Sequence, residues 1–180
     1  MVIFLKKIFK IALIFAVCFL AHNMYDWFDN SVTSIFFPVN ESIWEHMKII
    51  FTSTIIVSFF EYLRLKKAGL LYHNFWFSNI FSAFLSIPLY LVLFVPVYNV
   101  IGENMFFSIG LMLVVIIAVV YMAHYLSTKK EIRDMTLTSL IFLSLVYIGF
   151  GYLTYYPVHN GLFYDTTNNM YGINTYVLRD

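Results

Sequence analysis

Hydrophobic residues in this chain form long stretches that polar segments separate. Five stretches have about the 20 residues that a helix needs to cross the hydrocarbon core of a bilayer. They cover Val2–Met24, Ser42–Leu63, Phe75–Val100, Met105–Leu126 and Met135–Tyr156. The pattern predicts an all-α integral membrane bundle of about five transmembrane helices, formed by residues 1–156.

The first stretch has an alternative interpretation. Lys6, Lys7 and Lys10 precede a short apolar core with small residues after it, which is also the pattern of a secretory signal peptide. A lipoprotein signal is disfavoured because Val17, and not a small residue, precedes Cys18. We expect the stretch to remain in the protein as a span.

Composition supports a membrane location. Hydrophobic residues make up 61% of the chain and charged residues 12%, whereas soluble proteins have about 45–50% and about 25%. The expected partner is the lipid bilayer. A net charge of +1 gives no sign of nucleic-acid binding, and the single cysteine excludes a disulfide within the chain.

Basic residues predict the orientation. With five spans, nine of the 11 Lys and Arg residues fall on the side of the N-terminus. The positive-inside rule then puts the N-terminus inside and the C-terminus outside. Residues 157–180 form a polar, turn-rich tail, which we expect to be extracytoplasmic and to fold back on the outer mouth of the bundle.

The stretch of residues 38–48 is the most informative for chemistry. Glu41 and Glu45 are four residues apart, so a helix would place them on one face, and His46 would lie about 100° away. Two carboxylates and an imidazole would then cluster at the membrane boundary. The alternative is structural: Ser42 with Glu45 fits a capping box, and Glu45 with Lys48 fits an ordinary surface ion pair.

A second group lies at the same predicted depth. His22 and Asp26, four residues apart near the outer end of the first span, share a face if that helix continues. The alternative is a solvated helix end. The candidate catalytic or binding residues are therefore Glu41, Glu45, His46, His22 and Asp26.

Some of these side chains are also candidate ligands for a divalent metal, the one cofactor that the residues suggest. The candidate metal ligands, two of them in the tail, are His22, Glu45, His46, His159 and Asp165. The helical zinc-protease motif is absent, because Glu45-His46 lacks the second histidine at the required spacing. A further polar set, Glu61, His73 and His124, is expected at the opposite side of the membrane.

Pro38 to Lys48 resembles the signature of a family of small bacterial multipass membrane proteins of unknown function, Pro-x-Asn-Glu-Ser-x-Trp-Glu-His-x-Lys. His22 in the first span and the segment from His159 to Ile173 are also similar to that family, although a second proline beside His159 is missing. The resemblance implies a bacterial cytoplasmic membrane as the location and brings no activity.

The residues support three functional hypotheses. The first is an outward-facing carboxylate and histidine pocket that binds a small solute, an ion or a lipid headgroup. The second is a metal-dependent membrane hydrolase, and the third is a structural or accessory membrane subunit in which the motif only caps a helix. The sequence does not decide whether the protein is an enzyme.

Overall fold

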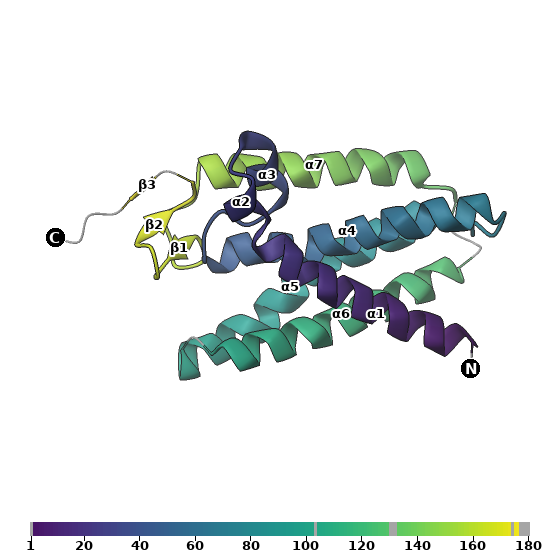
Figure 1. Cartoon of the computed structure of the whole chain (residues 1–180), viewed down its shortest axis with the longest axis horizontal. Helices are drawn as coiled ribbons and strands as arrows, with labels where there is room; N and C mark the ends of the chain where they lie inside the picture. The colour runs from purple at the N-terminus through teal and green to yellow at the C-terminus, as the bar shows by residue number, and fades with distance from the viewer. Residues whose placement is uncertain (1, 103, 130–132, 174, 177–180) are drawn as a thin grey trace.

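The computed structural model describes residues 2–102, 104–129, 133–173 and 175–176. Five long helices dominate it, and each covers one of the apolar stretches of the sequence. They are α1 (Val2–His22), α4 (Ile43–Lys67), α5 (Phe75–Ile101), α6 (Met105–Ser127) and α7 (Thr136–Tyr155). The expected all-helical fold class is confirmed (Figure 1).

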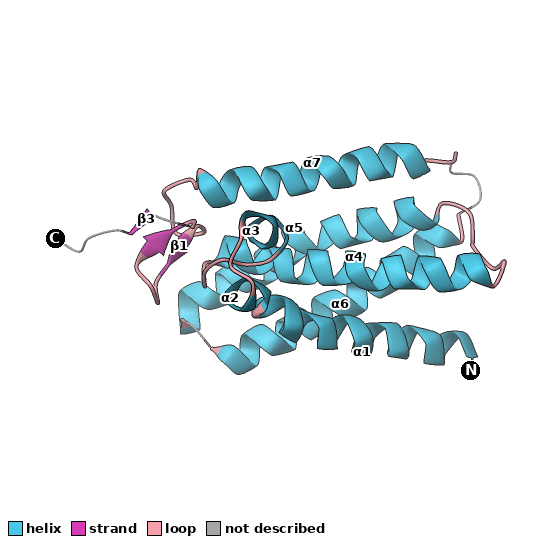
Figure 2. Ribbon diagram, turned by 45° about the horizontal axis from the view of Figure 1, so that its top comes forward, coloured by secondary structure: helices cyan, strands magenta, loops and turns pink. Residues whose placement is uncertain are grey.

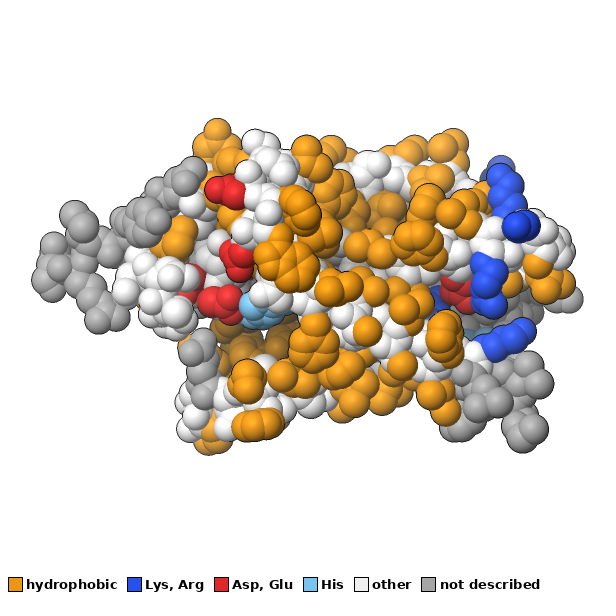
Figure 3. Space-filling model, in the orientation of Figure 1, with side chains coloured by type: hydrophobic (Ala, Val, Ile, Leu, Met, Phe, Trp, Pro, Cys, Tyr) orange, Lys and Arg blue, Asp and Glu red, His pale blue; other side chains and the backbone are white. Residues whose placement is uncertain are grey.

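Four of these helices, α4 to α7, are long and apolar enough to cross a membrane. Figure 3 shows hydrophobic side chains along the flanks of the bundle. Exposed large hydrophobic residues include Phe60, Val92 and Ile148. Water solvates such a surface poorly, whereas lipid solvates it well, and helices satisfy their backbone polar groups internally. The apolar helices are therefore compatible with a bilayer.

Charged side chains are segregated along the bundle. Figure 3 shows the Lys and Arg side chains gathered at one end and most visible carboxylates at the other. Helix α1 begins at the basic end, and α7 ends at the acidic end (Figure 1). We refer to these as the basic end and the acidic end of the bundle.

Helix α4 is the most enclosed of the four apolar helices. In its apolar stretch 61% of the residues are buried, compared with 33% in α5. It packs against α1 on one side and α5 on the other, and α6 packs against α5 and α1. The buried side chains at these contacts include Ile14, Cys18, Met47, Ile50, Val115 and Ile116.

Helix α5 bends near its middle (Figure 1). Pro88 lies there, and a proline inside a helix removes one backbone hydrogen bond and clashes with the carbonyl four residues earlier, here that of Phe84. The second half of α5 and the first half of α6 consequently lie away from α7.

Two short helices, α2 (Met24–Trp27) and α3 (Ser31–Phe36), connect α1 to α4. The Asn30 side chain caps α3 by accepting hydrogen bonds from the backbone N–H groups of Val32 and Thr33. Helix α3 packs against α7, and Thr52 of α4 donates a 2.8 Å hydrogen bond to the carbonyl of Phe36. The connection is thus inserted between two long helices.

The described part of the tail contacts the start of α4. It contains three short antiparallel strands, β1 (Tyr164–Asp165), β2 (Met170–Tyr171) and β3 (Thr175–Tyr176), in the order β1-β2-β3. They lie at the same end of the bundle as α2 and α3 (Figure 2). The backbone N–H of Trp44 donates to the carbonyl of Leu162 at 2.9 Å, and the Trp44 ring stacks on Phe163.

Candidate functional site

The start of α4 explains the position of Glu41. Ser42 is the N-cap of α4. Its backbone is extended, so the helix begins at the next residue, and its hydroxyl accepts a 3.3 Å hydrogen bond from the backbone N–H of Glu45. Glu41 therefore precedes the helix. The prediction that Glu41 and Glu45 share a helix face is wrong, because the chain changes direction at the cap, whereas the predicted capping role of Ser42 is confirmed.

His22, Glu41 and His46 converge at the acidic end of the bundle. They come from the last residue of α1, the residue before the α4 cap and the first turns of α4. The Glu41 Oε2 atom lies 3.3 Å from His46 Nε2 and 3.6 Å from His22 Nε2. One ligand atom from each side chain lies within 4.8 Å of the other two. We call these three residues the His-Glu-His cluster.

Neighbouring polar groups orient the cluster. The His46 Nδ1 atom lies 2.9 Å from the carbonyl oxygen of Ser42, which can only accept, so Nδ1 carries a proton and Nε2 is the ring nitrogen that faces Glu41. The backbone N–H of Glu41 donates a 3.0 Å hydrogen bond to Asp165 Oδ2. Asp165 thus holds the backbone of Glu41 in place without joining the cluster.

Two carboxyl groups of this region have lowered pKa values. The contact with His46 lowers the pKa of the Glu41 carboxyl, and this effect exceeds that of partial burial, which raises the pKa. Burial raises the pKa of Asp165, but the hydrogen bonds from Glu41, Asn168 and Thr167 outweigh it, so this pKa also lies below its usual value. Both groups therefore favour the carboxylate form.

The cluster has the composition of a three-ligand metal site and could hold a metal ion. Zinc–nitrogen and zinc–oxygen bonds of about 2.0–2.2 Å in a tetrahedron put neighbouring ligand atoms about 3.4 Å apart. The carboxylate-to-imidazole distances of 3.3 Å and 3.6 Å match this spacing. Two histidines and one glutamate are a ligand set that leaves the fourth position open in catalytic zinc sites.

A cavity of about 610 Å³ opens beside the cluster, between α1, α4, α5 and α6. His22, Glu41 and His46 lie on its polar rim. Figure 3 shows the opening as a hollow next to a histidine side chain, with hydrophobic side chains around it. The apolar wall includes Phe19, Ile50, Tyr90, Phe94, Ile109 and Met112. The cavity is therefore amphipathic.

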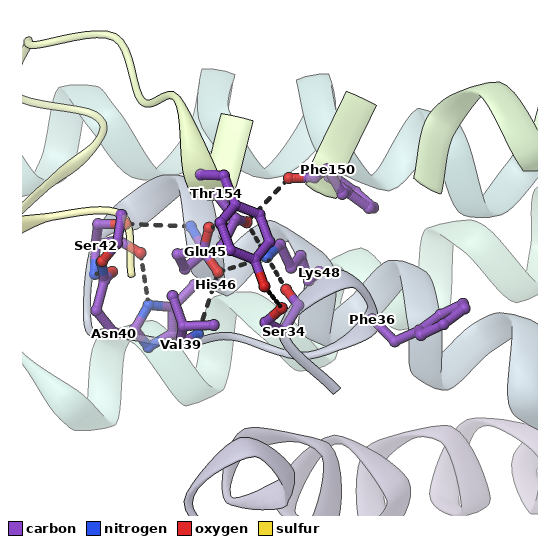
Figure 4. A network of polar contacts seen from close by, with 12 residues as sticks. Ser34, Phe36, Val39, Asn40, Ser42, Glu45, His46, Lys48, Phe150 and Thr154 are labelled. Carbon is purple, nitrogen blue, oxygen red and sulfur yellow. Dashed lines mark hydrogen bonds and ion pairs between the residues drawn. The ribbon is translucent and has the colours of Figure 1, made fainter. Parts of the chain in front are cut away.

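Glu45 belongs to a different, buried network (Figure 4). Its carboxylate accepts from Lys48 Nζ at 2.6 Å, from Thr154 Oγ1 at 2.9 Å and from the Val39 N–H at 3.1 Å. Lys48 also donates to the carbonyl of Ser34 at 2.9 Å. The interpretation of Glu45 and Lys48 as a surface pair is wrong, because both side chains are buried and join α3, α4 and α7.

The network includes a residue that sequence reasoning missed. Thr154 lies 106 positions after Lys48 and makes hydrogen bonds to both ends of the ion pair. No local pattern in the sequence marks this threonine. Lys48 alone gave a signal, because a lysine inside an apolar stretch requires a partner.

The other sequence candidates lie outside the cavity wall. Helix α1 ends at His22, and Asp26 lies in the separate helix α2, so the two do not share one continuous helix face. His159 stacks on the ring of Tyr171, with the ring centroids 4.5 Å apart. The described residues that line the cavity do not include four of the sequence candidates, namely Asp26, His159, Glu45 and Asp165.

A search of curated proteins and a search of solved structures found no match to this chain. Residues 4–173 match the model of a "Family of unknown function (DUF6512)". The match covers far more than half of the 180 residues, and the chain therefore belongs to this family of unknown function.

Proposed function

We propose that this protein is an integral membrane protein that binds a divalent metal ion through His22, Glu41 and His46, and that the metal binds the headgroup of a small amphiphilic ligand. The observation that carries the proposal is the convergence of three ligand atoms, within 4.8 Å of one another, at the rim of the cavity. Imidazole and carboxylate donors suit Zn²⁺ and related ions.

The proposal includes five spans, with α1 as the fifth, an inside N-terminus and an outside C-terminus. The cluster then faces the outside of the cell membrane, which the family resemblance suggests is a bacterial cytoplasmic membrane. The segregation of basic residues to one end of the bundle supports this orientation (Figure 3). Reporters fused to the two ends should lie on opposite sides of the membrane, and reporters on the same side would contradict five spans.

The cavity wall supports an amphiphile as the ligand. Ligand sites are mostly apolar, with a few polar groups that fix the orientation of the ligand. Here the polar groups lie at the rim, whereas Tyr90, Phe94 and Met112 line the apolar part. An oxygen-rich headgroup would occupy the fourth metal position, and a hydrocarbon chain would lie along the apolar wall.

Metal analysis of the purified protein tests the central step. After incubation with Zn²⁺ and removal of free metal, we expect one ion per wild-type chain. His22→Ala, Glu41→Gln and His46→Ala should each lower the affinity by more than about 100-fold, because each removes one direct ligand. His159→Ala is the matched control, since this histidine also belongs to the acidic end but not to the cluster.

The results separate the hypotheses. Equal metal content in the wild type and all three cluster variants would contradict the site. A wild type without metal would favour the accessory-subunit interpretation, in which the residues only shape the start of α4.

A metal-dependent hydrolase is the second candidate. The open fourth position of a three-ligand site favours it, because metal-bound water is a nucleophile near neutral pH. A hydrolase commonly also needs a carboxylate base. Glu41 is the only carboxylate among the described lining residues, and it is already assigned to the metal, so the lining offers no separate base. Release of a fatty acid from lipid esters by the metal-loaded wild type, and not by His46→Ala, would favour the hydrolase.

A further inference from the structure

A second cavity lies at the basic end of the bundle, between α1 and α4. The two helices approach each other toward the end of α1 and spread apart toward its beginning (Figures 1 and 2). The space between them is a groove of about 440 Å³. Its walls include Lys6, Phe9 and Lys10 from α1 and Phe60, Glu61 and Arg64 from α4.

The ion pair between Lys10 and Glu61 lies in the wall of the groove. Lys10 Nζ lies 2.6 Å from Glu61 Oε2 and also donates to Asn79 Oδ1 at 2.7 Å. The two side chains are only 13% and 23% exposed, so each charge is compensated by the other. This pair joins α1 to α4 and contributes no net charge to the groove.

Lys6 and Arg64 provide an uncompensated charge of +2. Both side chains are exposed, and neither forms an ion pair with any residue that the structure describes. Of the groove residues they lie nearest the ends of their helices, about one turn beyond Phe9 and Phe60. An anion with several oxygen atoms fits such a pair, because guanidinium binds phosphate in a bidentate manner and ammonium adds a point charge.

The wall of the groove is apolar next to these charges, on the side away from the helix ends. Phe9 is 70% exposed and Phe60 is 62% exposed, and both belong to the groove. From the end of the helices inward, the groove therefore presents first cationic and then hydrocarbon-like surface. A phospholipid in the leaflet at this end presents the same order, phosphate first and acyl chains next.

We propose that the groove between α1 and α4 is a binding site for one anionic phospholipid, with its phosphate at Lys6 and Arg64 and an acyl chain along Phe9 and Phe60. Basic pockets between membrane helices on the cytoplasmic side bind the headgroups of anionic lipids. The site does not depend on the His-Glu-His cluster, which lies at the opposite end of the bundle.

The test compares the thermal stability of the full chain in phosphatidylcholine nanodiscs with and without phosphatidylglycerol. We expect phosphatidylglycerol to raise the melting temperature of the wild type by several degrees. Lys6→Gln and Arg64→Gln should each reduce this rise by about half, because each removes one of the two uncompensated charges. The double variant should lose the rise.

Lys67→Gln is the matched control, since Lys67 ends the same helix as Arg64 but lies outside the groove. It should keep the full rise. An equal loss in Lys67→Gln would show general attraction to a negative surface and overturn the proposal. So would a full rise in the double variant.

A second arm separates the lipid from its phosphate. Inorganic phosphate, added to the protein in a neutral detergent, should stabilise the wild type much less than detergent-solubilised phosphatidylglycerol does. Equal stabilisation by the two would mean that the apolar wall contributes nothing, and the proposed occupant would then be wrong.

Discussion

Glu45 and Lys48 form an ion pair inside the protein, with 2.6 Å between the carboxylate and the ammonium and side-chain exposures of 2% and 0%. Thr154 and the backbone of Ser34 and Val39 supply the remaining hydrogen bonds. Removing charges from water is costly, so such a pair is stable only when its hydrogen bonds are complete. The pair therefore joins three parts of the chain and is structural.

Removing one member of this pair is expected to be severe. Lys48→Met leaves the Glu45 carboxylate buried without its cation, which costs about 3–5 kcal/mol of unfolding free energy. The double variant Glu45→Gln/Lys48→Met removes both charges and should regain most of the loss. Melting temperatures in one detergent measure this, and a double variant as unstable as Lys48→Met would contradict the compensation.

The five long helices could be predicted from the sequence because hydrophobic stretches of this length are a strong, local signal. The cap at Ser42 was also predictable, since capping depends on neighbouring residues. The position of Glu41 outside the helix could not be predicted, because the sequence alone allows either Asn40 or Ser42 to be the N-cap. Because Ser42 is the N-cap, Glu41 lies outside the helix that contains Glu45, and its carboxylate lies beside His22 and His46.

The features that could not be predicted from the sequence depend on contacts between segments that are far apart in the chain. The partners of Lys48 come from α3 and α7, and no spacing rule connects them to α4. Strands β1 and β2 have two residues each, which is too short for an alternating pattern to appear. Such features follow from packing in three dimensions, and one sequence carries little trace of them.

Gly172 holds the tail against α7. Its φ angle is +55°, and an added Cβ atom would lie 2.2 Å from the carbonyl oxygen of Thr154. The same carbonyl accepts the Ile173 N–H, and the Gly172 carbonyl accepts a hydrogen bond from Asn40. Gly172→Ala should therefore release the tail from the bundle and increase its cleavage by an added protease.

Gly161→Ala is the control for this experiment. Gly161 belongs to the same tail, but a Cβ atom added there meets nothing within 4 Å. This variant should be cleaved at the wild-type rate. If Gly172→Ala is also cleaved at the wild-type rate, the close approach to Thr154 does not hold the tail.

Docking of the tail is expected to depend on pH through Asp165. Its pKa is lowered in the folded protein, mainly because the hydrogen bonds from Glu41, Asn168 and Thr167 favour the carboxylate despite burial. A lowered pKa contributes stability that is complete above the unfolded value of about 3.9 and is lost as the pH falls through the folded pKa. Protection of the Glu41 amide against hydrogen exchange should thus decrease below about pH 4.

Asp165→Asn tests the assignment. The amide cannot ionise, so the variant should dock its tail more weakly near neutral pH and lose this part of the pH dependence. An unchanged pH profile in Asp165→Asn would assign the effect to another carboxyl group.

The amphipathic cavity makes a prediction about two positions on α6. Met112 lines the cavity, whereas Val114 lies outside the lining and is 54% exposed. Dodecyl phosphate should raise the affinity of the wild type for Co²⁺ by about tenfold, because a ligand that binds the metal-loaded form better must strengthen metal binding equally. In Met112→Trp the indole fills the space for the chain, so this gain should disappear while the Co²⁺ affinity without ligand stays the same. Val114→Trp adds the same ring toward the outside and should keep the gain.

Inorganic phosphate has the headgroup chemistry without the chain, so a gain equal to that of dodecyl phosphate would show that the apolar wall has no role in binding.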